Sequence, residues 1–438
     1  MRNERIVRIN VKRKFIKFIS MVCCAPLLCG AIACGSTPPP TQPPSTEPEG
    51  YVKQLAPQKE WINATTWGDE LMEAYLRPYW YTREVYNETC TFVGESGEAT
   101  LMYEPTLVHS VRSYDLSTTY LEGIDYEIVG RKIKRIPTGS MPYWGIEEYY
   151  RPTMGALDIR LTVEDSLAGQ VTWSPCYLPY HDGDATITSK QVAITYRHNE
   201  IYSGNYPEAQ KDKLTNVLEK MANGEDINIA VYGDSVSVGC NASGTSYGGN
   251  INPYMPAWFN IVKQYIEKKY DITANVSSNG QGGWKLQDCI DNYDARMKGG
   301  DYDFLMLRIG GNDQATTENQ YKKQLLDLLD EFFGDYPNAN VVIVTPEVAN
   351  GQCAGWQGSV PFIEMWTEEV IKAHANANQI AIAKVTSFDD WLELRGKMDR
   401  DWLANNINHG NDFMIRSYVQ TILKVMFGTD YVNEYEGQ

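Results

Sequence analysis

The stretch Ile227-Asn228-Ile229-Ala230-Val231-Tyr232-Gly233-Asp234-Ser235 decides the fold of this 438-residue chain. Its apolar run is typical of a buried strand, and the strand runs directly into a Gly-Asp-Ser turn. Similar apolar runs follow at residues 272–276, 304–309, 341–345 and 380–385, with helical patterns between them at 256–269, 286–297, 319–333 and 362–375. A last helix is predicted at 413–427. Strands that alternate with helices predict a parallel sheet covered on both faces, so residues 206–438 are expected to form a three-layer α/β/α domain.

Four short motifs lie where these predicted strands end or shortly before the last helix. They are Gly233-Asp234-Ser235, Gly280-Gln281-Gly282-Gly283, Gly310-Gly311-Asn312-Asp313 and Asn406-Ile407-Asn408-His409. The carboxyl ends of neighbouring parallel strands meet at one edge of a sheet, so residues distant in sequence can converge there. Together the motifs offer a hydroxyl nucleophile, a glycine amide, a carboxamide and an imidazole base, which are the groups needed to attack an ester carbonyl.

The order and residue types of these motifs resemble the SGNH (GDSL-type) serine hydrolases over residues 227–427. The resemblance implies that Ser235 is the nucleophile and that its own amide is one oxyanion-hole donor. Gly283 would supply the second amide and Asn312 the third donor. His409 would take the proton of Ser235 and pass it to the leaving alcohol. Asp234 is expected to be a structural hydrogen-bonding residue behind the nucleophile.

The chain departs from the family at one position. The family usually has Asp-x-x-His, whereas Asn406 stands three residues before His409 here. A neutral carboxamide can orient the imidazole ring but cannot stabilise its charged form as an aspartate does. We therefore expect a Ser-His dyad in which Asn406 is an orienting residue of secondary importance. Two alternatives are open: a main-chain carbonyl orients the ring, or a nearby aspartate does, the candidates being Asp399, Asp401 and Asp412.

Residues 51–205 carry short β-prone runs separated by turn clusters, which predicts a β-sandwich of jelly-roll type ahead of the α/β domain. Family 2 carbohydrate esterases have a similar arrangement, and the resemblance implies removal of acetyl groups from polysaccharide. Tyrosine and tryptophan are dense in this region. Aromatic faces suit sugar rings, although core packing explains most such residues.

The N-terminus has the three parts of an export signal. A basic segment is followed by the apolar run 18–33, so residues 1–33 are predicted to be a signal peptide. Ala31-Ile32-Ala33-Cys34 resembles a bacterial lipobox, which would make Cys34 a lipidated residue; ordinary cleavage with a free Cys34 is the alternative. Residues 34–50 are rich in proline and are predicted to be an extended tether. We expect an extracellular lipoprotein whose contact with membrane is limited to its anchor.

Charge and cysteine usage exclude several classes of function. The net charge is −17 and becomes more negative without the basic signal, which disfavours a nucleic-acid partner. The five cysteines after Cys34 are widely and irregularly spaced, which indicates isolated buried thiols, although one pair could bridge. The histidines other than His409 have no metal-ligand spacing. No metal and no organic cofactor is expected.

Three functions fit these observations. The first is an esterase that removes short acyl groups, above all O-acetyl groups of a polysaccharide or oligosaccharide. The second is a lipase or thioesterase using the same machinery, although the loop 240–246 is small and polar rather than a lining for a long acyl chain. The third is a surface lipoprotein that binds glycans without catalysis.

Overall fold

The computed structural model describes residues 55–161 and 171–435. Residues Gly50–Gln438 form one compact unit. The predicted signal peptide, Cys34 and the tether lie outside the described residues and stay predictions, as does the domain boundary between residues 205 and 206.

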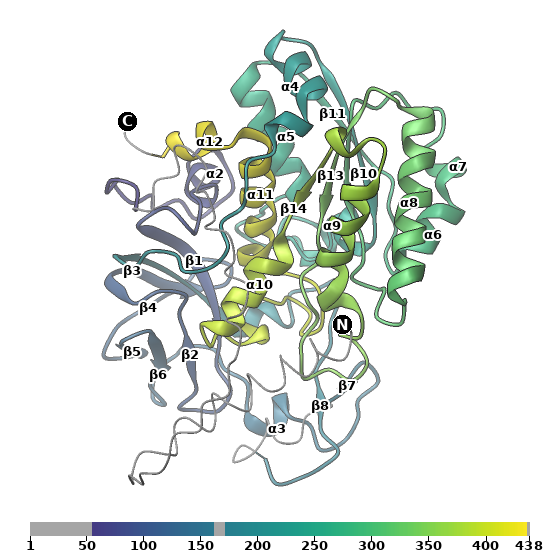
Figure 1. Cartoon of the computed structure of the whole chain (residues 1–438). Coiled ribbons are helices and arrows are strands. Elements are labelled where there is room, and N and C mark those ends of the chain that lie inside the picture. Colours follow the sequence, from purple (N-terminus) through teal and green to yellow (C-terminus); the bar gives the residue numbers. More distant parts are fainter. Residues whose placement is uncertain (1–54, 162–170, 436–438) are drawn as a thin grey trace, which may run out of the picture. The chain divides into compact units, whose positions relative to one another are not determined.

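A five-stranded parallel sheet forms the centre of the C-terminal region, in the order β11-β10-β12-β13-β14 (Figure 1). Its strands are β10 (Ile227–Gly233), β11 (Ala274–Ser278), β12 (Phe304–Arg308), β13 (Asn340–Val344) and β14 (Ile380–Ala383). β10 runs between β11 and β12, so the Gly-Asp-Ser turn leaves the sheet between two neighbouring strand ends. The predicted α/β class with a parallel sheet is confirmed.

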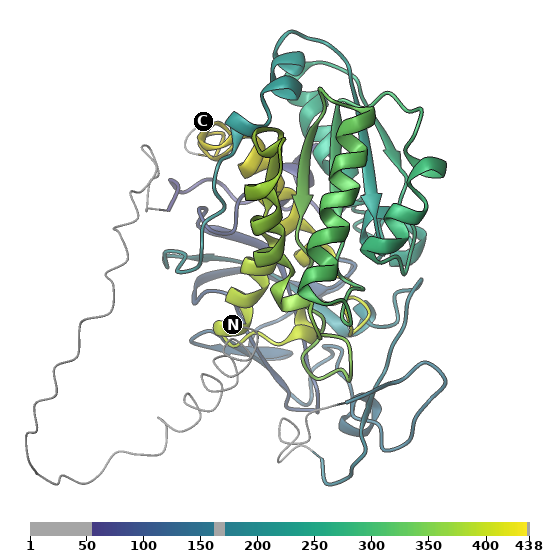
Figure 2. The same cartoon turned by 45° about the vertical axis from the view of Figure 1, so that its right-hand side comes forward.

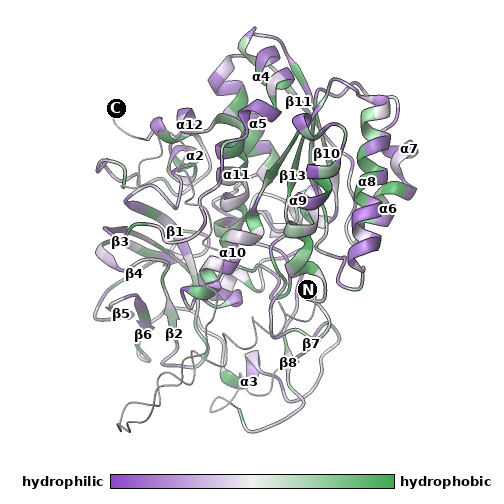
Figure 3. Ribbon diagram, in the orientation of Figure 1, coloured by the Kyte–Doolittle hydropathy of each residue, from purple (hydrophilic) through white to green (hydrophobic). Residues whose placement is uncertain are grey.

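Helices cover both faces of this sheet because its central strands are apolar on both sides (Figures 1, 2 and 3). Ile229 and Val231 belong to one buried cluster, shared with α5 (Trp258–Tyr270) and α11 (Asp412–Phe427). Ala230 and Tyr232 belong to the other. That second cluster is shared with α6 (Leu286–Asp291), α7 (Tyr293–Arg296), α8 (Glu318–Asp335) and α9 (Ile363–Ala373). The remaining helices of the region are α4 (Thr215–Ala222), α10 (Val385–Leu394) and α12 (Thr429–Asn433).

The N-terminal region is β-rich, as predicted, and its sheets are antiparallel. Its main sheet has the order β1-β9-β3-β4, and two smaller sheets have the orders β2-β6-β5 and β7-β8. The strands are β1 (Glu84–Thr91), β2 (Glu98–Thr100), β3 (Pro105–Ser113), β4 (Thr119–Tyr120), β5 (Tyr126–Val129), β6 (Lys132–Arg135), β7 (Ile159–Arg160), β8 (Tyr177–Leu178) and β9 (Gln191–His198). The helices are α2 (Asp69–Tyr75) and α3 (Ile146–Tyr149).

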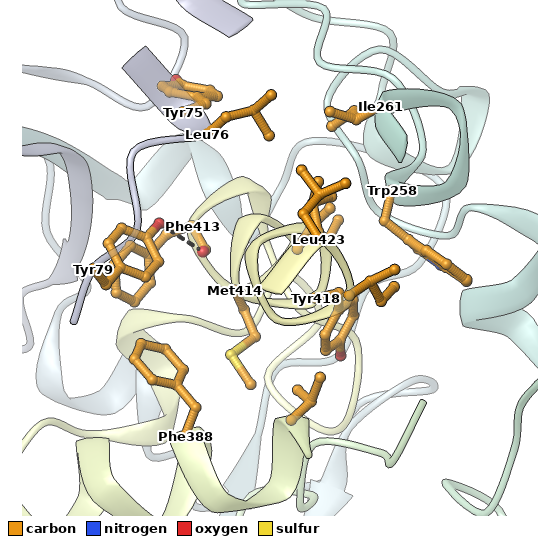
Figure 4. Packing of buried hydrophobic residues seen from close by; sticks show 14 of the residues in the cluster. Tyr75, Leu76, Tyr79, Trp258, Ile261, Phe388, Phe413, Met414, Tyr418 and Leu423 are labelled. Atoms are coloured by element: carbon orange, nitrogen blue, oxygen red, sulfur yellow. Dashed lines mark hydrogen bonds between the residues drawn. The ribbon is translucent and has the colours of Figure 1, made fainter. Parts of the chain in front are cut away.

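Helix α11 joins the two regions and is buried along its whole length. Its apolar side chains pack in one cluster with residues of α2, α5 and α10 (Figure 4). Its polar residue Arg416 reaches an irregular point of β1, where Asn87 has a positive φ of 43°. The Arg416 guanidinium donates to the carbonyls of Tyr86 at 2.6 Å and Asn87 at 2.8 Å. The bulge leaves these carbonyls outside the strand ladder, and the arginine satisfies them.

The β-sheet also fixes the loop that precedes α11. Thr91 donates its amide to the Asp401 carboxylate at 2.8 Å and its hydroxyl to the Arg400 carbonyl at 2.7 Å. Gln191 of β9 donates to the carbonyls of Arg400 and Leu403, both at 2.9 Å. The β-rich region therefore holds the segment of chain that leads to His409.

Candidate active site

The turn after β10 places Ser235 at the edge of the sheet. Gly233 has a φ of 139°, and a Cβ on it would lie 1.7 Å from the Arg308 carbonyl oxygen, so only glycine fits there. Asp234 accepts a hydrogen bond from the amide of Val236 at 3.0 Å and caps the short 3₁₀ turn Ser235–Val238. These constraints fix Ser235 as the first residue of that turn.

Ser235 and His409 form a hydrogen-bonded pair, although 174 residues separate them in sequence. The Ser235 Oγ lies 2.7 Å from Nε2 of His409. Both residues are buried, with 7% and 6% of their surfaces exposed. This is the contact that a general base needs to remove the hydroxyl proton of a nucleophile.

Asn405 builds the loop that carries His409. Its side-chain oxygen accepts three backbone hydrogen bonds, from Ile407 at 2.9 Å, Asn408 at 3.0 Å and His409 at 3.1 Å. The amide of Ala404 donates to the His409 carbonyl at 2.8 Å and closes the loop. The loop is thus rigidly shaped by an asparagine that the motif comparison did not single out.

Asn406, which was expected to orient the imidazole, does not do so. Its backbone has a positive φ of 67°, and its side chain donates to the Pro179 carbonyl at 2.9 Å. The residue therefore ties the loop to the β-rich region and leaves the ring of His409 to other partners. This corrects the assignment of Asn406 as a catalytic residue.

The ring is held instead by two residues that the sequence did not indicate. Nδ1 of His409 lies 2.8 Å from Oδ1 of Asn241 and 3.0 Å from Oδ1 of Asp182. The three aspartates considered from the sequence have other partners. Asp399 accepts a hydrogen bond from the Gly351 amide, Asp401 from the Thr91 amide and Asp412 from the Ser243 amide.

The expected oxyanion-hole residues lie in the same cavity as this pair. Ser235, Gly283, Asn312 and His409 line one cavity of about 240 Å³. Gly283 has a φ of +83°, a left-handed conformation that favours glycine. Within residues 55–161 and 171–435, its amide has no hydrogen-bond acceptor. The side-chain Nδ2 of Asn312 donates one hydrogen to the Trp284 carbonyl at 3.0 Å. This bond orients Nδ2 and leaves its second hydrogen for a ligand.

Asp234 has the structural role expected of it. Its second carboxylate oxygen pairs with Arg308, whose guanidinium also pairs with Glu347. Tyr418 donates to the same glutamate. Burial raises the pKa of Asp234, and the Arg308 charge opposes that shift. This buried ionic network fixes the turn behind the nucleophile.

Loss of the Asn312 side chain gives a direct test of the oxyanion hole. We expect Asn312→Ala to lower kcat by about 10²–10³-fold, the usual effect of one missing donor. The matched control is Gln281→Ala, because that carboxamide lies on the neighbouring glycine-rich block but accepts a hydrogen bond from Arg296 at 2.8 Å. The measurement is the steady-state hydrolysis of an aryl acetate. Equal kcat values for both variants would remove Asn312 from the oxyanion hole.

The described cysteines, Cys90, Cys176, Cys240, Cys289 and Cys353, are all free and buried. Cys240 lines the catalytic cavity, and burial raises the pKa of its thiol to about 12, so it is not a thiolate at neutral pH. Nowhere in the described chain do three or more His, Cys, Asp or Glu side chains gather as a metal site. Nor is any helix of the described residues both long and apolar enough to cross a bilayer.

Ser235, Gly283, Asn312 and His409 thus lie around one cavity at the edge of the parallel sheet, as the resemblance of the motifs to SGNH hydrolases led us to expect. No protein-family model matches the chain, and no curated protein matches it.

Several solved structures are similar to parts of the chain at low sequence identity. One is a two-domain esterase active on acetylated mannans, at 16% identity and a TM-score of 0.39, covering 54% of this chain and 55% of that one. An acetyl xylan esterase from Geobacillus stearothermophilus is 14% identical, with a TM-score of 0.37, covering 46% and 94% of the two chains. A putative GDSL-like lipase from Parabacteroides merdae is 17% identical, with a TM-score of 0.36, covering 45% and 95%. The similarity spans only about half the length of the two-domain esterase.

Proposed function

We propose that this protein is a serine esterase that hydrolyses short acyl esters through an acyl-enzyme intermediate. The 2.7 Å contact between the Ser235 hydroxyl and His409 Nε2 carries the proposal. The hydroxyl is aligned with its base, and both residues open into a cavity that Gly283 and Asn312 also line.

The reaction proceeds in two halves on these residues. The Ser235 oxygen attacks the ester carbonyl carbon while His409 takes the hydroxyl proton. The negative charge on the carbonyl oxygen is stabilised by the amides of Ser235 and Gly283 and by the side chain of Asn312. His409 then gives the proton to the departing alcohol, which leaves Ser235 acylated. A water molecule, deprotonated by His409, attacks the acyl carbon. The bond from that carbon to the Ser235 oxygen then breaks, the carboxylic acid is released, and His409 returns the proton to Ser235.

The size and the lining of the cavity favour a substrate in which a short acyl group esterifies a hydrophilic alcohol. Its volume of about 240 Å³ is smaller than the roughly 300–1,000 Å³ of sites for drug-sized ligands. Its walls include the aromatic residues Tyr180, Tyr247 and Trp356, and Tyr247 is 49% exposed. An exposed ring beside the nucleophile offers an apolar face to a sugar ring. We take an O-acetylated polysaccharide or oligosaccharide as the substrate, presented to an exported enzyme.

A chain-length series tests this substrate class. We expect kcat/KM to fall steeply from acetyl to butyryl and longer aryl esters, because extra methylene groups do not fit a small acyl site without strain. Acetate release from acetylated xylan and acetylated mannan is measured in parallel, with the Ser235→Ala variant as the blank. A preference for long acyl chains, with no acetate from either glycan, would favour the lipase or thioesterase function instead.

A further inference from the structure

A loop of the β-rich region reaches the catalytic histidine from the side opposite Ser235. Asp182 lies in the connection between β8 and β9, and its Oδ1 is 3.0 Å from Nδ1 of His409. The other ring nitrogen contacts the nucleophile at 2.7 Å. We propose that Asp182 is the acid that positions His409 and stabilises its charged form, so that the β-rich region supplies part of the catalytic machinery. This inference rests on the proposed esterase function.

The surroundings of Asp182 keep it ionised. Burial alone would raise its pKa, but hydrogen bonds from His409, Tyr180 and Asn405, together with the charge of His409, outweigh burial and lower the pKa below its usual value. Asn405 donates to Oδ1 at 3.2 Å, and the Tyr180 hydroxyl donates to Oδ2. Both oxygens are therefore occupied, and the carboxylate is fixed with its charge toward the imidazole.

Asn241 shares the task of orienting the ring but not that of balancing its charge. Its Oδ1 is 2.8 Å from the same Nδ1 of His409. One N–H thus has two acceptors, a neutral one from the loop after Ser235 and an anionic one from the β-rich region. With either acceptor present, the proton stays on Nδ1 and Nε2 remains free to take the Ser235 proton.

When His409 takes that proton, the ring becomes positively charged. Asp182 is the carboxylate in direct contact with it. The charge of Asp234 also acts on His409, but that carboxylate is already paired with the buried Arg308. Three further titratable groups line the cavity: Cys240, Tyr180 and Tyr247. Burial raises the pKa of the Cys240 thiol and of the Tyr180 hydroxyl, so these two groups are neutral during turnover. The stabilisation of the imidazolium therefore comes chiefly from Asp182.

The same loop contains a matched control. Asp184 stands two residues after Asp182, pairs with His181 at 3.5 Å and has a half-exposed side chain. Its Oδ1 accepts from the Thr186 amide at 2.8 Å, a bond that an asparagine oxygen can also accept. Asp184→Asn removes the same charge from the same loop without touching His409.

The test compares kcat, KM and pH profiles of full-length Asp182→Asn and Asp184→Asn. Asp182→Asn should lower kcat by roughly 10²-fold with little change in KM. This loss of kcat is smaller than the approximately 10⁴-fold loss seen when the triad aspartate of a serine protease is neutralised, because Asn241 still holds the proton of His409 on Nδ1. Protonation of the ring is less favourable without the neighbouring anion, so the acidic limb of kcat/KM should move to lower pH. Asp184→Asn should match the unchanged protein in kcat and in pH profile.

Two results would overturn the inference. One is an Asp182→Asn variant with kcat within twofold of the unchanged protein. The other is a loss of activity that comes with a lower melting temperature and no shift of the acidic limb, which would make Asp182 a structural residue only. If Asp182→Asn fails to fold, Asp182→Ala is assayed with added formate, and recovery of activity by formate but not by chloride supports the inference, whereas no recovery contradicts it. Ser235→Ala is assayed beside them, because its retained activity would refute the proposed function itself.

Discussion

Replacement of Ser235 by alanine should lower ester hydrolysis by at least about 10⁴-fold, since loss of the nucleophile alone costs nearly as much as loss of the whole catalytic unit. The variant removes one hydroxyl, whose partner is His409. The turn around it is fixed by Gly233, by the Asp234 cap and by the buried arginine, none of which changes. The measurement is kcat/KM for an aryl acetate, with circular dichroism and thermal melting to show that the fold is intact.

Ser246→Ala is the matched control for this prediction. Ser246 is an exposed serine in the loop that follows the nucleophile, so its loss tests for a general effect of removing a hydroxyl near the cavity. Its kcat/KM should stay within about twofold of the unchanged protein, as is usual for a surface substitution. If Ser235→Ala retained the activity of the unchanged protein, the active site would have to lie elsewhere.

Arg308→Met should have the largest effect on stability, about 3–5 kcal/mol of unfolding free energy at neutral pH. Arg308 is 2% exposed and lies between the carboxylates of Asp234 and Glu347. Removing the guanidinium leaves two buried carboxylates without their cation. The resulting loss of unfolding free energy is larger than the stability that the intact ionic network adds, because buried charges without a partner are strongly destabilising. Urea denaturation at pH 8 measures the change.

The same variant should show a characteristic pH dependence. Burial already raises the pKa of Asp234 while Arg308 pulls it down, so loss of the arginine raises it further. An acid whose pKa is raised in the folded state destabilises the fold above that pKa and ceases to do so as the pH falls. The difference in unfolding free energy from the unchanged protein should therefore be smaller at pH 5 than at pH 8.

Lys323→Met serves as the control for Arg308→Met because it breaks an exposed ion pair with Asp327 on the surface of α8. Its unfolding free energy should change by no more than about 0.5 kcal/mol. Equal effects of the two variants, or a difference for Arg308→Met that does not depend on pH, would contradict the role given to the buried network.

The α/β region was predictable because its strands are buried on both faces. Residues 227–232 and 304–309 are nearly continuous apolar runs, and such runs are typical of a covered parallel sheet. Helix α10 (Val385–Leu394) was missed, since the apolar pattern of β14 runs on to Val385 and no glycine or proline marks the change.

Strand β1 shows why the β-rich region was harder to predict. Every residue of Glu84–Thr91 is buried, yet five of the eight are polar, so the sequence has no apolar run there. The polar groups are satisfied by distant partners: Glu88 pairs with Lys397 at 2.8 Å, and Thr91 bonds to Asp401 and Arg400. These partners come from the other end of the chain, and no local pattern reveals them.

Some residues of the candidate site could be predicted from the sequence, and others could not. Ser235, Gly283, Asn312 and His409 could be placed together because each follows a predicted strand or precedes the last helix, and sheet geometry brings such positions to one edge. Asp182 could not be placed, because it lies in a loop of the β-rich region with no fixed spacing to His409. The Tyr180-His181-Asp182-Gly183-Asp184 cluster indicates only a polar turn. The motif also does not encode the backbone conformation of the loop, which gives Asn405 the contacts that shape it and turns Asn406 toward Pro179.

The proposed esterase reaction requires that Ser235 becomes covalently acylated during turnover. The most direct measurement is inactivation of the full-length protein with an organophosphate ester, followed by peptide mass spectrometry. We expect one phosphoryl adduct per molecule, located on Ser235, with activity lost in proportion to labelling and no adduct in His409→Ala. An adduct on another residue, or full activity in a protein completely labelled at Ser235, would contradict it.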